Sequence, residues 1–413
     1  MSKFSTPWSN DLSGNISLIP LGRLVSLRKE KNDPIQLTQV LSLTASRGVI
    51  LYEDKGDIGN QASDDIARYS VVRVGDIVIN SMNVIIGSVG ISRYEGVLSQ
   101  VYYVLKPNKN NLINMHYLAY HFQIVSFQKS LTRIGYGILD HRMRIPWINL
   151  QAELIAVPTI EKQRDIVRYL DSQVPRINSL ISLFHEQLRL SREAFQVLVE
   201  HKTSHQLNKS DVKISLRRIV RLDPITDLPK SQDPLVTFLG LEDVQPGKLG
   251  NFGEFRNIGD VLSGYSRFKS GDILVPKVSP SFGHGRAVVV PDSVSEVGFA
   301  STEVYVLRCR NPRDAHYICA SLRARDFLLQ GESTYQGVAG VKRVDKEFIL
   351  DWTIRWPKEH LRAEIANEIA EAQRKLELLE DFTEKAVSKL SELRSSIIFD
   401  AITKNGFIET KAN

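Results

Sequence analysis

Two long segments, residues 161–200 and 360–400, have the most regular pattern of apolar and polar positions in the chain. In each, apolar residues recur at alternating spacings of three and four, and Glu, Lys, Arg and Gln fill most of the other positions. This alternation predicts helices that pack along a coiled-coil seam. The predicted seam residues are Leu170, Ile177, Phe184, Leu188 and Leu198 in the first segment, and Ile369, Leu376, Leu379, Leu390 and Ile397 in the second.

Four further residues in these segments predict features of helix packing or helix geometry. Ser191 and Thr383 each place a hydroxyl in a seam at different levels, which would help to fix the register of two packed helices. Leu393 is expected to continue the second seam. Because proline lacks a backbone donor, Pro175 predicts either a bend in the first helix or its true start.

The remaining sequence contains shorter runs of β-branched and aromatic residues bounded by Gly, Asn, Asp and Pro, a pattern typical of strands. These runs are VVRVGDIVI (71–79), SQVYYVL (99–105), LVTFLGLEDV (235–244), GDILVPKV (271–278) and EVYVLRC (303–309). Residues 116–131 and 316–330 have helical spacing. We therefore predict an α+β fold, with two mixed, β-rich globular heads in tandem and a long helix after each.

The two halves of the chain repeat one another in order, which indicates an internal duplication. YSVVRVGDIVIN (69–80) recurs as YSRFKSGDILVP (265–276), and GVLSQVYYVLKP (96–107) recurs as GFASTEVYVLRC (298–309). The repeated aspartates, Asp76 and Asp272, are expected to cap turns. The predicted domains are head 1 at 1–158, the first helix at 159–208, head 2 at 209–357, and the second helix with a C-terminal tail at 358–413.

Composition narrows the class of protein. The chain has 413 residues, of which 42% are hydrophobic and 24% charged, and this suits two or three globular domains. The net charge of +6 permits a nucleic-acid partner without requiring one. The two cysteines, Cys309 and Cys319, form no CxxC pair, the first 15 residues lack a signal-peptide core, and no run is long enough to span a membrane. We expect a cytoplasmic protein without disulfides or membrane contact.

No catalytic or metal-binding motif stands out in the sequence. GLEDVQPGK (240–248) has the wrong glycine spacing for a phosphate loop, and GYGILD (135–140) lacks the third glycine of a dinucleotide loop. His201 and His205 lack the glutamate of a zinc-protease helix, so we expect them at the surface. Two heads without a catalytic set favour recognition over catalysis.

Polar and basic residues gather in loops that follow the predicted strands of each head. Such side chains can contact base edges and phosphates of DNA. The candidate DNA-binding residues are Arg28, Lys29, Asn80, Ser81, Asn83, Arg93, Arg133, Tyr136, His141, Arg142 and Arg144 in head 1, and Arg217, Arg218, Lys277, Ser279, His284, Arg286, Tyr335, Gln336, Lys342 and Arg343 in head 2.

Two globular heads, each followed by a long helix, resemble the specificity subunit of type I restriction–modification enzymes. The resemblance rests on the repeated GDIVI and GDILV strands, on the loops GYGILDHRMRI (135–145) and TYQGVAGVKRV (334–344), and on the lead into the first helix. There Pro158, Glu161, Gln163 and Ile166 match the family's Pro-x-x-Glu-x-Gln-x-x-Ile pattern. The second copy departs from this pattern at His360 and Arg362.

This resemblance implies a chain without catalytic residues or cofactors of its own. Each head would be a target recognition domain that reads one half of an asymmetric, bipartite site in double-stranded DNA. The two coiled-coil helices would pack antiparallel and set the spacer between the half-sites. Two modification subunits would dock on them and methylate adenine with S-adenosylmethionine, and restriction (motor-nuclease) subunits would supply the chemistry that uses ATP and Mg.

Two alternatives come from other classes of protein. One is a self-sufficient enzyme, which activity of the isolated chain on DNA would support. The modest net charge also fits a coiled-coil scaffold whose heads bind proteins or glycans. DNA binding that weakens steeply with salt would distinguish the specificity subunit from this scaffold.

Overall fold

A computed structural model describes residues 16–44, 47–55, 65–82, 84–136, 143–203, 212–228, 235–250, 253–292, 297–337 and 342–404. Several sequence predictions fall outside these ranges. They concern the first 15 residues, the histidine His205, and the candidate DNA-binding residues Asn83, His141 and Arg142.

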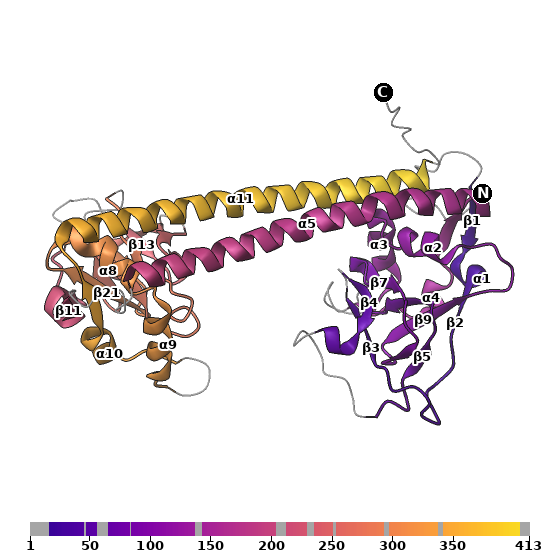
Figure 1. Cartoon of the computed structure of the whole chain (residues 1–413), viewed down its shortest axis with the longest axis horizontal. Coiled ribbons are helices and arrows are strands. Elements are labelled where there is room, and N and C mark those ends of the chain that lie inside the picture. The colour runs from indigo at the N-terminus through magenta and orange to yellow at the C-terminus, as the bar shows by residue number, and fades with distance from the viewer. Residues whose placement is uncertain are drawn as a thin grey trace. The chain divides into compact units, whose positions relative to one another are not determined.

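The chain divides into two compact units (Figure 1). Unit 1 comprises Met1–Leu183 with Lys385–Asn413, and unit 2 comprises Phe184–Glu384. Each unit therefore contains one head and about half of each long helix. The domains predicted from the sequence instead treated each helix as a separate segment.

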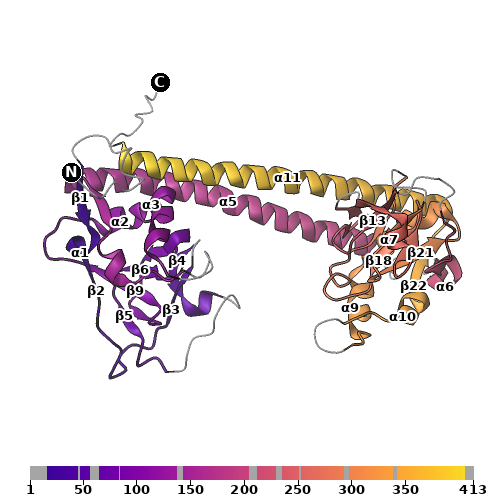
Figure 2. The same ribbon diagram turned by 180° about the vertical axis from the view of Figure 1, so that it is seen from behind.

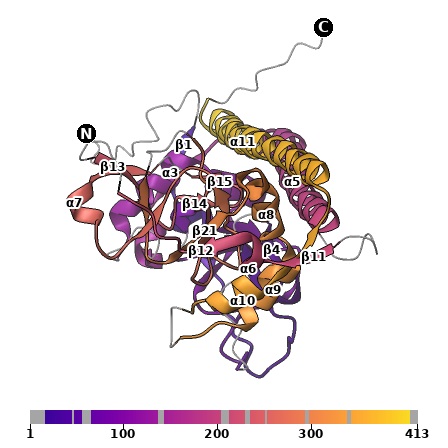
Figure 3. The same cartoon turned by 90° about the vertical axis from the view of Figure 1, so that its left-hand side faces the viewer.

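The two long helices are α5, Ile160–Thr203, and α11, Glu359–Thr403. In unit 2 they lie side by side (Figure 3). Lys202 pairs with Glu368, and Arg192 Nη2 lies 2.8 Å from the Glu380 carboxylate. Residue numbers increase along α5 while those of their partners on α11 decrease, so the helices pack antiparallel here, as predicted.

Most of the predicted seam is covered, and it is most deeply buried where the helices meet a head. Leu170 and Ile369 are buried in the cores of units 1 and 2, respectively. Ile177 is also buried. The other predicted seam residues are half-buried: Phe184, Leu188, Leu198, Leu376, Leu379, Leu390 and Ile397.

One expectation about the seam needs correction, and another stays open. Leu393 is 49% exposed, because at this level α11 packs against the head of unit 1 through neighbouring positions such as Ile398. The Thr383 hydroxyl is buried without a hydrogen-bond partner among the described residues, so it forms no bond with Ser191. A register-fixing role for the two hydroxyls stays a prediction.

Pro175 lies inside α5, which already begins at Ile160. The prediction that proline marks the true start of the helix is therefore wrong. The missing N–H deprives the Asp171 carbonyl of its helical donor.

Unit 1 is built on an antiparallel sheet in the order β2-β9-β6-β7. Figure 2 labels β2, β9 and β6 of this sheet. The hairpin β3–β4 and the antiparallel pair β5–β8 pack against it in a shared apolar cluster, and β1–β10 ties the start of the head to the entry of α5. The strands are β1 Ser17–Pro20, β2 Val25–Leu27, β3 Leu41–Thr44, β4 Gly48–Leu51, β5 Ser70–Val72, β6 Ile77–Asn80, β7 Val89–Ile91, β8 Gly96–Leu98, β9 Tyr102–Pro107 and β10 Leu154–Val157.

Short helices complete unit 1, and α2 and α3 lie between the sheet and the long helices (Figure 1). Residues 116–131, predicted with helical spacing, form two helices that are separated at Phe122–Ile124. The helices of this head are α1 Leu21–Leu24, α2 Met115–His121, α3 Val125–Ser130 and α4 Trp147–Leu150, with 3-10 turns at Tyr52–Lys55, Val84–Ile86 and Leu131–Ile134.

Unit 2 repeats this plan. Its sheet β12-β21-β18-β19 has the same order as β2-β9-β6-β7, and β11–β22 corresponds to β1–β10. In unit 2 a sheet β16-β13-β20-β17, in which β13 and β20 run parallel, includes the pair β17–β20, which corresponds to β5–β8 of unit 1. The strands are β11 Val212–Ser215, β12 Val220–Leu222, β13 Leu235–Leu239, β14 Val244–Gln245, β15 Lys248–Leu249, β16 Glu254–Asn257, β17 Ser266–Phe268, β18 Ile273–Pro276, β19 Val288–Val289, β20 Gly298–Ala300, β21 Val304–Cys309 and β22 Thr353–Trp356.

The helices of head 2 also follow the repeat, since residues 316–330 again form two helices rather than one. They are α6 Leu216–Ile219, α7 Ile258–Val261, α8 Ala315–Ser321, α9 Arg325–Ser333 and α10 Lys346–Asp351, with a 3-10 turn at Pro312–Asp314.

The repeated aspartates cap turns, as predicted, and they also anchor each sheet. Asp76 Oδ2 accepts from the Arg73 amide at 2.8 Å, and Asp272 Oδ2 accepts from the Lys269 amide at 2.9 Å. Gly75 and Gly271 precede them with φ of +88° and +80°, a backbone region that favours glycine. Both carboxylates are buried, and each is held by an arginine.

The arginine comes from a different strand in each unit. Arg28, just after β2, donates to both Asp76 oxygens at 2.7 and 2.8 Å. Arg308, on β21, donates to both Asp272 oxygens at 2.7 Å. Since β21 corresponds to β9, the two copies satisfy the same buried carboxylate from different strands of the sheet.

His121, at the end of α2, is fully buried, and its Nε2 accepts from the Ala156 amide at 3.3 Å. Burial lowers the pKa of His121 to about 3. The folded state therefore keeps this imidazole neutral, whereas the unfolded chain protonates it near pH 6.5. Unit 1 should lose stability as pH falls from about 6.5 towards 3, by about 2 kcal/mol between pH 8 and pH 5.

Urea unfolding at a series of pH values tests this expectation. His121→Gln, which keeps an acceptor for Ala156, should flatten the pH dependence between pH 5 and 8. His116→Gln on the same helix is the matched control, because the His116 side chain is exposed. An unchanged pH profile in His121→Gln would contradict the assignment.

Candidate nucleic-acid interface

In unit 1, hydrogen bonds bring two of the predicted loops together. The Ile145 amide donates to the Ser81 carbonyl at 2.9 Å, and the Tyr103 hydroxyl donates to the Ile145 carbonyl at 2.9 Å. Tyr136 and Arg144 exchange main-chain bonds of 2.9 and 3.0 Å. The loop after β6 therefore lies beside the segment that leads to α4.

Unit 2 builds the same arrangement from different residues. The Val344 amide donates to the Lys277 carbonyl at 2.8 Å, and the Tyr305 hydroxyl donates to the Val344 carbonyl at 3.2 Å. Gln336 and Arg343 exchange main-chain bonds of 2.9 Å. We call the surface formed by these two loops in each unit the paired-loop surface: residues 80–82, 136 and 143–144 in unit 1, and residues 277–286, 335–337 and 342–343 in unit 2.

Some predicted residues of unit 1 serve the fold instead of the surface. Ser81 is fully buried and donates to the Val101 carbonyl at 2.8 Å, so it is not accessible to DNA. Arg28 is largely covered and committed to Asp76. Arg133 Nη2 lies 2.6 Å from the buried Glu153 carboxylate, which ties its guanidinium to the head.

Predicted residues of unit 2 are also partly engaged. Arg217 pairs with Glu347 and Asp351, and Arg343 pairs with Glu303 at 2.6 Å. Hydrogen bonding from Arg343 lowers the pKa of Glu303 and keeps this ion pair charged. Lys277 Nζ donates to the Thr302 carbonyl at 2.8 Å, and burial lowers the pKa of this ammonium. These three cations can reach DNA only by exchanging internal partners.

The remaining predicted residues are better placed for contact. Three polar side chains are half-buried at the loop bases: Asn80, Ser279 and Tyr335. Arg286 is also half-buried. The exposed residues, none with an ion-pair partner among the described residues, are Lys29, Arg93, Tyr136, Arg144, Arg218, His284, Gln336 and Lys342.

Sequence reasoning missed one cation of unit 1. Arg47 lies in the turn of the β3–β4 hairpin, and its guanidinium donates to the Asp54 carbonyl at 3.0 Å. Its neighbour Gly48 has a φ of +68°, which is typical of a tight hairpin turn. The Arg-Gly pair between two apolar runs was the available clue.

The described residues offer little for covalent or metal chemistry. Burial raises the pKa of the Cys309 thiol to about 12 and that of the Cys319 thiol to about 11, so neither supplies a thiolate at neutral pH. Neither cysteine is in a disulfide. Within the described ranges, no group of three or more His, Cys, Asp or Glu side chains is placed to hold a metal ion. Nor is any described helix long and apolar enough to cross a membrane.

Known proteins resemble this chain in part of its sequence. The specificity subunit of the type I restriction enzyme EcoEI of Escherichia coli is 33% identical over 113 residues, which are 27% of this chain and 19% of that protein. The EcoAI specificity subunit of Escherichia coli is 28% identical over 145 residues, 35% of this chain and 24% of that protein. These matches span about a fifth to a quarter of the relatives' lengths. No family model matches.

A solved structure shows the same fold over nearly the whole chain. It comes from work on complex assembly and conformational transition of the type I restriction–modification system, and it covers 96% of this chain and 99% of its own with a TM-score of 0.66 at 14% identity. The predicted α+β fold is thereby confirmed. The chain is thus similar in sequence to type I restriction enzyme specificity subunits and shares its fold with a protein of a type I restriction–modification system.

Proposed function

We propose that this chain is the non-catalytic DNA specificity subunit of a type I restriction–modification complex, in which each head reads one half of a bipartite target. The observation that carries the proposal is the repeated paired-loop surface. Both units anchor the same two loops through the same hydrogen bonds, yet the loops present different side chains. Two heads that recognise different half-sites require the same loop framework with different contact residues.

The side chains on these surfaces suit the two kinds of DNA contact. Arg144, Gln336 and Lys342 can donate to base edges in the major groove or to phosphates. Tyr136 and Gln336 occupy corresponding positions in the isolated bridges opposite Arg144 and Arg343, so the two heads differ where contact is expected. Different residues at equivalent positions predict an asymmetric target.

The long helices offer surfaces for protein partners. Contiguous patches of exposed apolar side chains are typical of protein interaction sites, and the two long helices together expose such side chains in each unit. They are Leu180, Leu183 and Leu393 in unit 1, and Leu190, Val197, Leu378 and Phe382 in unit 2. We propose that one modification subunit docks on the helices of each unit and supplies S-adenosylmethionine for adenine methylation. Restriction subunits with ATP and Mg would complete the complex.

Mapping of adenine methylation tests this function. The chain, produced with its modification subunits, is expected to direct methylation to one asymmetric, bipartite motif with a fixed spacer. Arg286→Ala should relax base preference in one half of the motif and leave the other half unchanged. Methylation without a bipartite motif, or the same change in both halves, would refute the proposal.

Salt dependence separates this function from a scaffold with protein- or glycan-binding heads. DNA affinity should fall steeply with salt, because each phosphate contact releases counterions. A chain that binds DNA no better at low salt than at high salt would favour the scaffold.

A further inference from the structure

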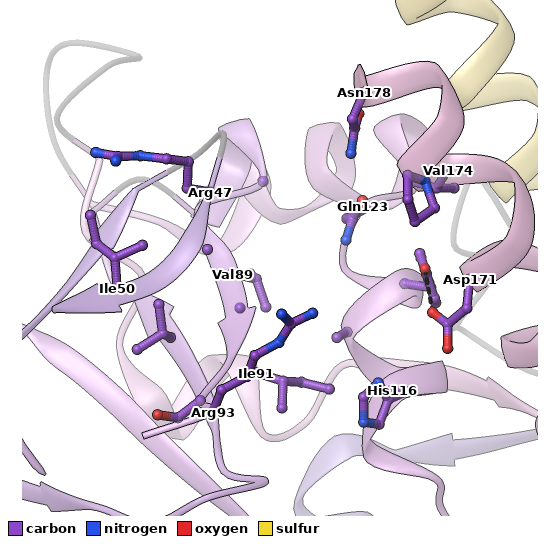
Figure 4. Close-up of a pocket in the computed structure, with 18 of the residues that line it drawn as sticks. Arg47, Ile50, Val89, Ile91, Arg93, His116, Gln123, Asp171, Val174 and Asn178 are labelled. Carbon is purple, nitrogen blue, oxygen red and sulfur yellow. Dashed lines mark hydrogen bonds between the residues drawn. The ribbon is translucent and has the colours of Figure 1, made fainter. Parts of the chain in front are cut away.

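Unit 1 contains an open pocket of about 590 Å³ at the junction of its head with the long helices (Figure 4). One wall is formed by β4 and β7, and the other by α2, α5 and α11. The floor is a close crossing of two glycines, because a Cβ on Gly90 would lie 3.0 Å from the Gly48 Cα and from the Val49 amide nitrogen. This close approach of β4 and β7 leaves no room for a side chain at Gly90.

Cations dominate the lining of this pocket. Arg93 follows β7, and its guanidinium points into the pocket (Figure 4) without an ion-pair partner among the described residues. Arg47 lies at the opposite edge and donates to a main-chain carbonyl. Asp171 is the acidic residue of the lining, and its carboxylate already accepts from the Tyr120 hydroxyl at 2.7 Å. Amide donors are added by Asn178, which points into the pocket from α5 (Figure 4).

A third cation, Arg394 of α11, is half-buried at the back of the pocket. Its Nη2 donates to Gln123 Oε1 at 2.7 Å, but its Nε has no hydrogen-bond partner among the described residues. Burial lowers the pKa of Arg394, which reflects the cost of holding this charge away from water. A guanidinium without a carboxylate in such a place is stabilised when an anion binds nearby.

The corresponding positions of unit 2 are satisfied within the unit. Arg323 stands where unit 1 has Gln123, and its guanidinium donates to Gln373 Oε1 at 2.8 Å and lies 5.3 Å from the centre of the Phe195 ring. Glu377 stands where unit 1 has Asn178, and it pairs with Lys248 at 3.5 Å. Arg323 and Arg325 also line an open pocket of about 420 Å³ in unit 2, but Arg323 is held there by Gln373, whereas the Arg394 Nε of unit 1 has no partner among the described residues.

We propose that the pocket of unit 1 binds a phosphate group and, resting on the function proposed above, that the DNA backbone supplies it. Guanidinium groups bind phosphate oxygens in a planar, two-pronged fashion. Arg93 points into the pocket and is placed to do so, whereas the Arg47 guanidinium at the rim would first have to leave the Asp54 carbonyl. Asn178 would add a donor from the long helix. Phosphate contacts position DNA without reading its sequence, so this site would orient the duplex on head 1.

The first experiment measures DNA affinity of the complex with its modification subunits over a range of salt concentrations. Arg93→Gln should weaken binding of cognate and unrelated duplexes by the same factor, about tenfold at low salt. It should also reduce the salt slope by about 0.9, because one phosphate is no longer neutralised. Arg47→Gln should act in the same direction. Arg164→Gln removes the same charge from an exposed position of α5 outside the pocket, and it should match the wild type.

The second experiment identifies the source of the phosphate. Thermal unfolding is measured in inorganic phosphate and in chloride at equal ionic strength. If phosphate raises the Tm of the wild type but not of Arg93→Gln, while DNA affinity is unchanged by the substitution, the site takes free phosphate and the DNA assignment is overturned. If Arg93→Gln alters neither DNA affinity nor phosphate stabilisation, the pocket is not a phosphate site.

Failure of this inference differs from failure of the proposed function. A wild-type complex that shows no preference for any duplex refutes the specificity function, and the phosphate measurement still reports on the pocket. A wild-type complex that binds its target, with an Arg93→Gln variant of equal affinity and salt slope, leaves the function intact and refutes the DNA contact.

Discussion

Asp272→Asn should destabilise unit 2 by about 3 kcal/mol or more, because it removes one partner of a buried ion pair and leaves the other charged. Asp272 is 1% exposed, and Arg308 donates to both of its oxygens. Asparagine has nearly the same shape and can still accept from the Lys269 amide. The expected loss of stability therefore comes from the unpaired charge of Arg308 and not from a cavity at position 272.

Urea unfolding measures this loss of stability. The transition of the unit that carries no substitution serves as an internal reference. A chain with two compact units need not unfold in a single step. Asp272→Asn should shift the transition of unit 2, and Asp76→Asn should shift that of unit 1. Asp260→Asn, at an exposed position of α7, is the matched control with the same change of charge.

A double variant separates the ion pair from the turn that Asp272 caps. Adding Arg308→Met to Asp272→Asn removes the unpaired cation, so it should restore part of the lost stability. If the double variant is less stable than Asp272→Asn alone by the full effect of Arg308→Met, the two residues are not coupled. That result would contradict the ion-pair explanation.

The sequence predicted these aspartates as turn caps but not their arginines. Local spacing reveals the cap, because Asp76 is three residues after its donor Arg73. The ion-pair partner Arg28 comes from a strand that is distant in sequence, and Arg308 comes from a different strand in the second copy. Arg28 consequently looked like a free cation for DNA. An ion pair between residues that are distant in sequence produces no periodic pattern from which it could be predicted.

The long helices were predictable for the opposite reason. Their seam repeats over many turns, and each repeat adds evidence for the same structure. Leu393 was misplaced because the pattern does not show where α11 buries other positions, such as Ile398, in the core that α5 and head 1 share. The pocket of unit 1 was not predictable at all, since Arg47, Asn178 and Arg394 come from three distant segments.

Deleting residues 184–190 together with 378–384 should shorten the DNA spacer and leave both half-sites unchanged. The two segments lie at the same level of the antiparallel pair, as the Phe184 and Phe382 rings show with centroids 5.9 Å apart. Removing one heptad from each helix keeps the seam in phase. Seven residues rise about 10.5 Å, so the spacer should shorten by up to about three base pairs at about 3.4 Å each.

Single deletions provide the control for this experiment. Deleting 184–190 alone, or 378–384 alone, leaves the partner helix with an unmatched heptad, so the seam loses its register on one side of the deletion. Each single deletion should lower the stability of unit 2 and reduce methylation at every site. The paired deletion should retain methylation at the new spacing. If it methylates only the original motif with its original spacer, the helices do not set the spacer, and the heads must find their half-sites by other means.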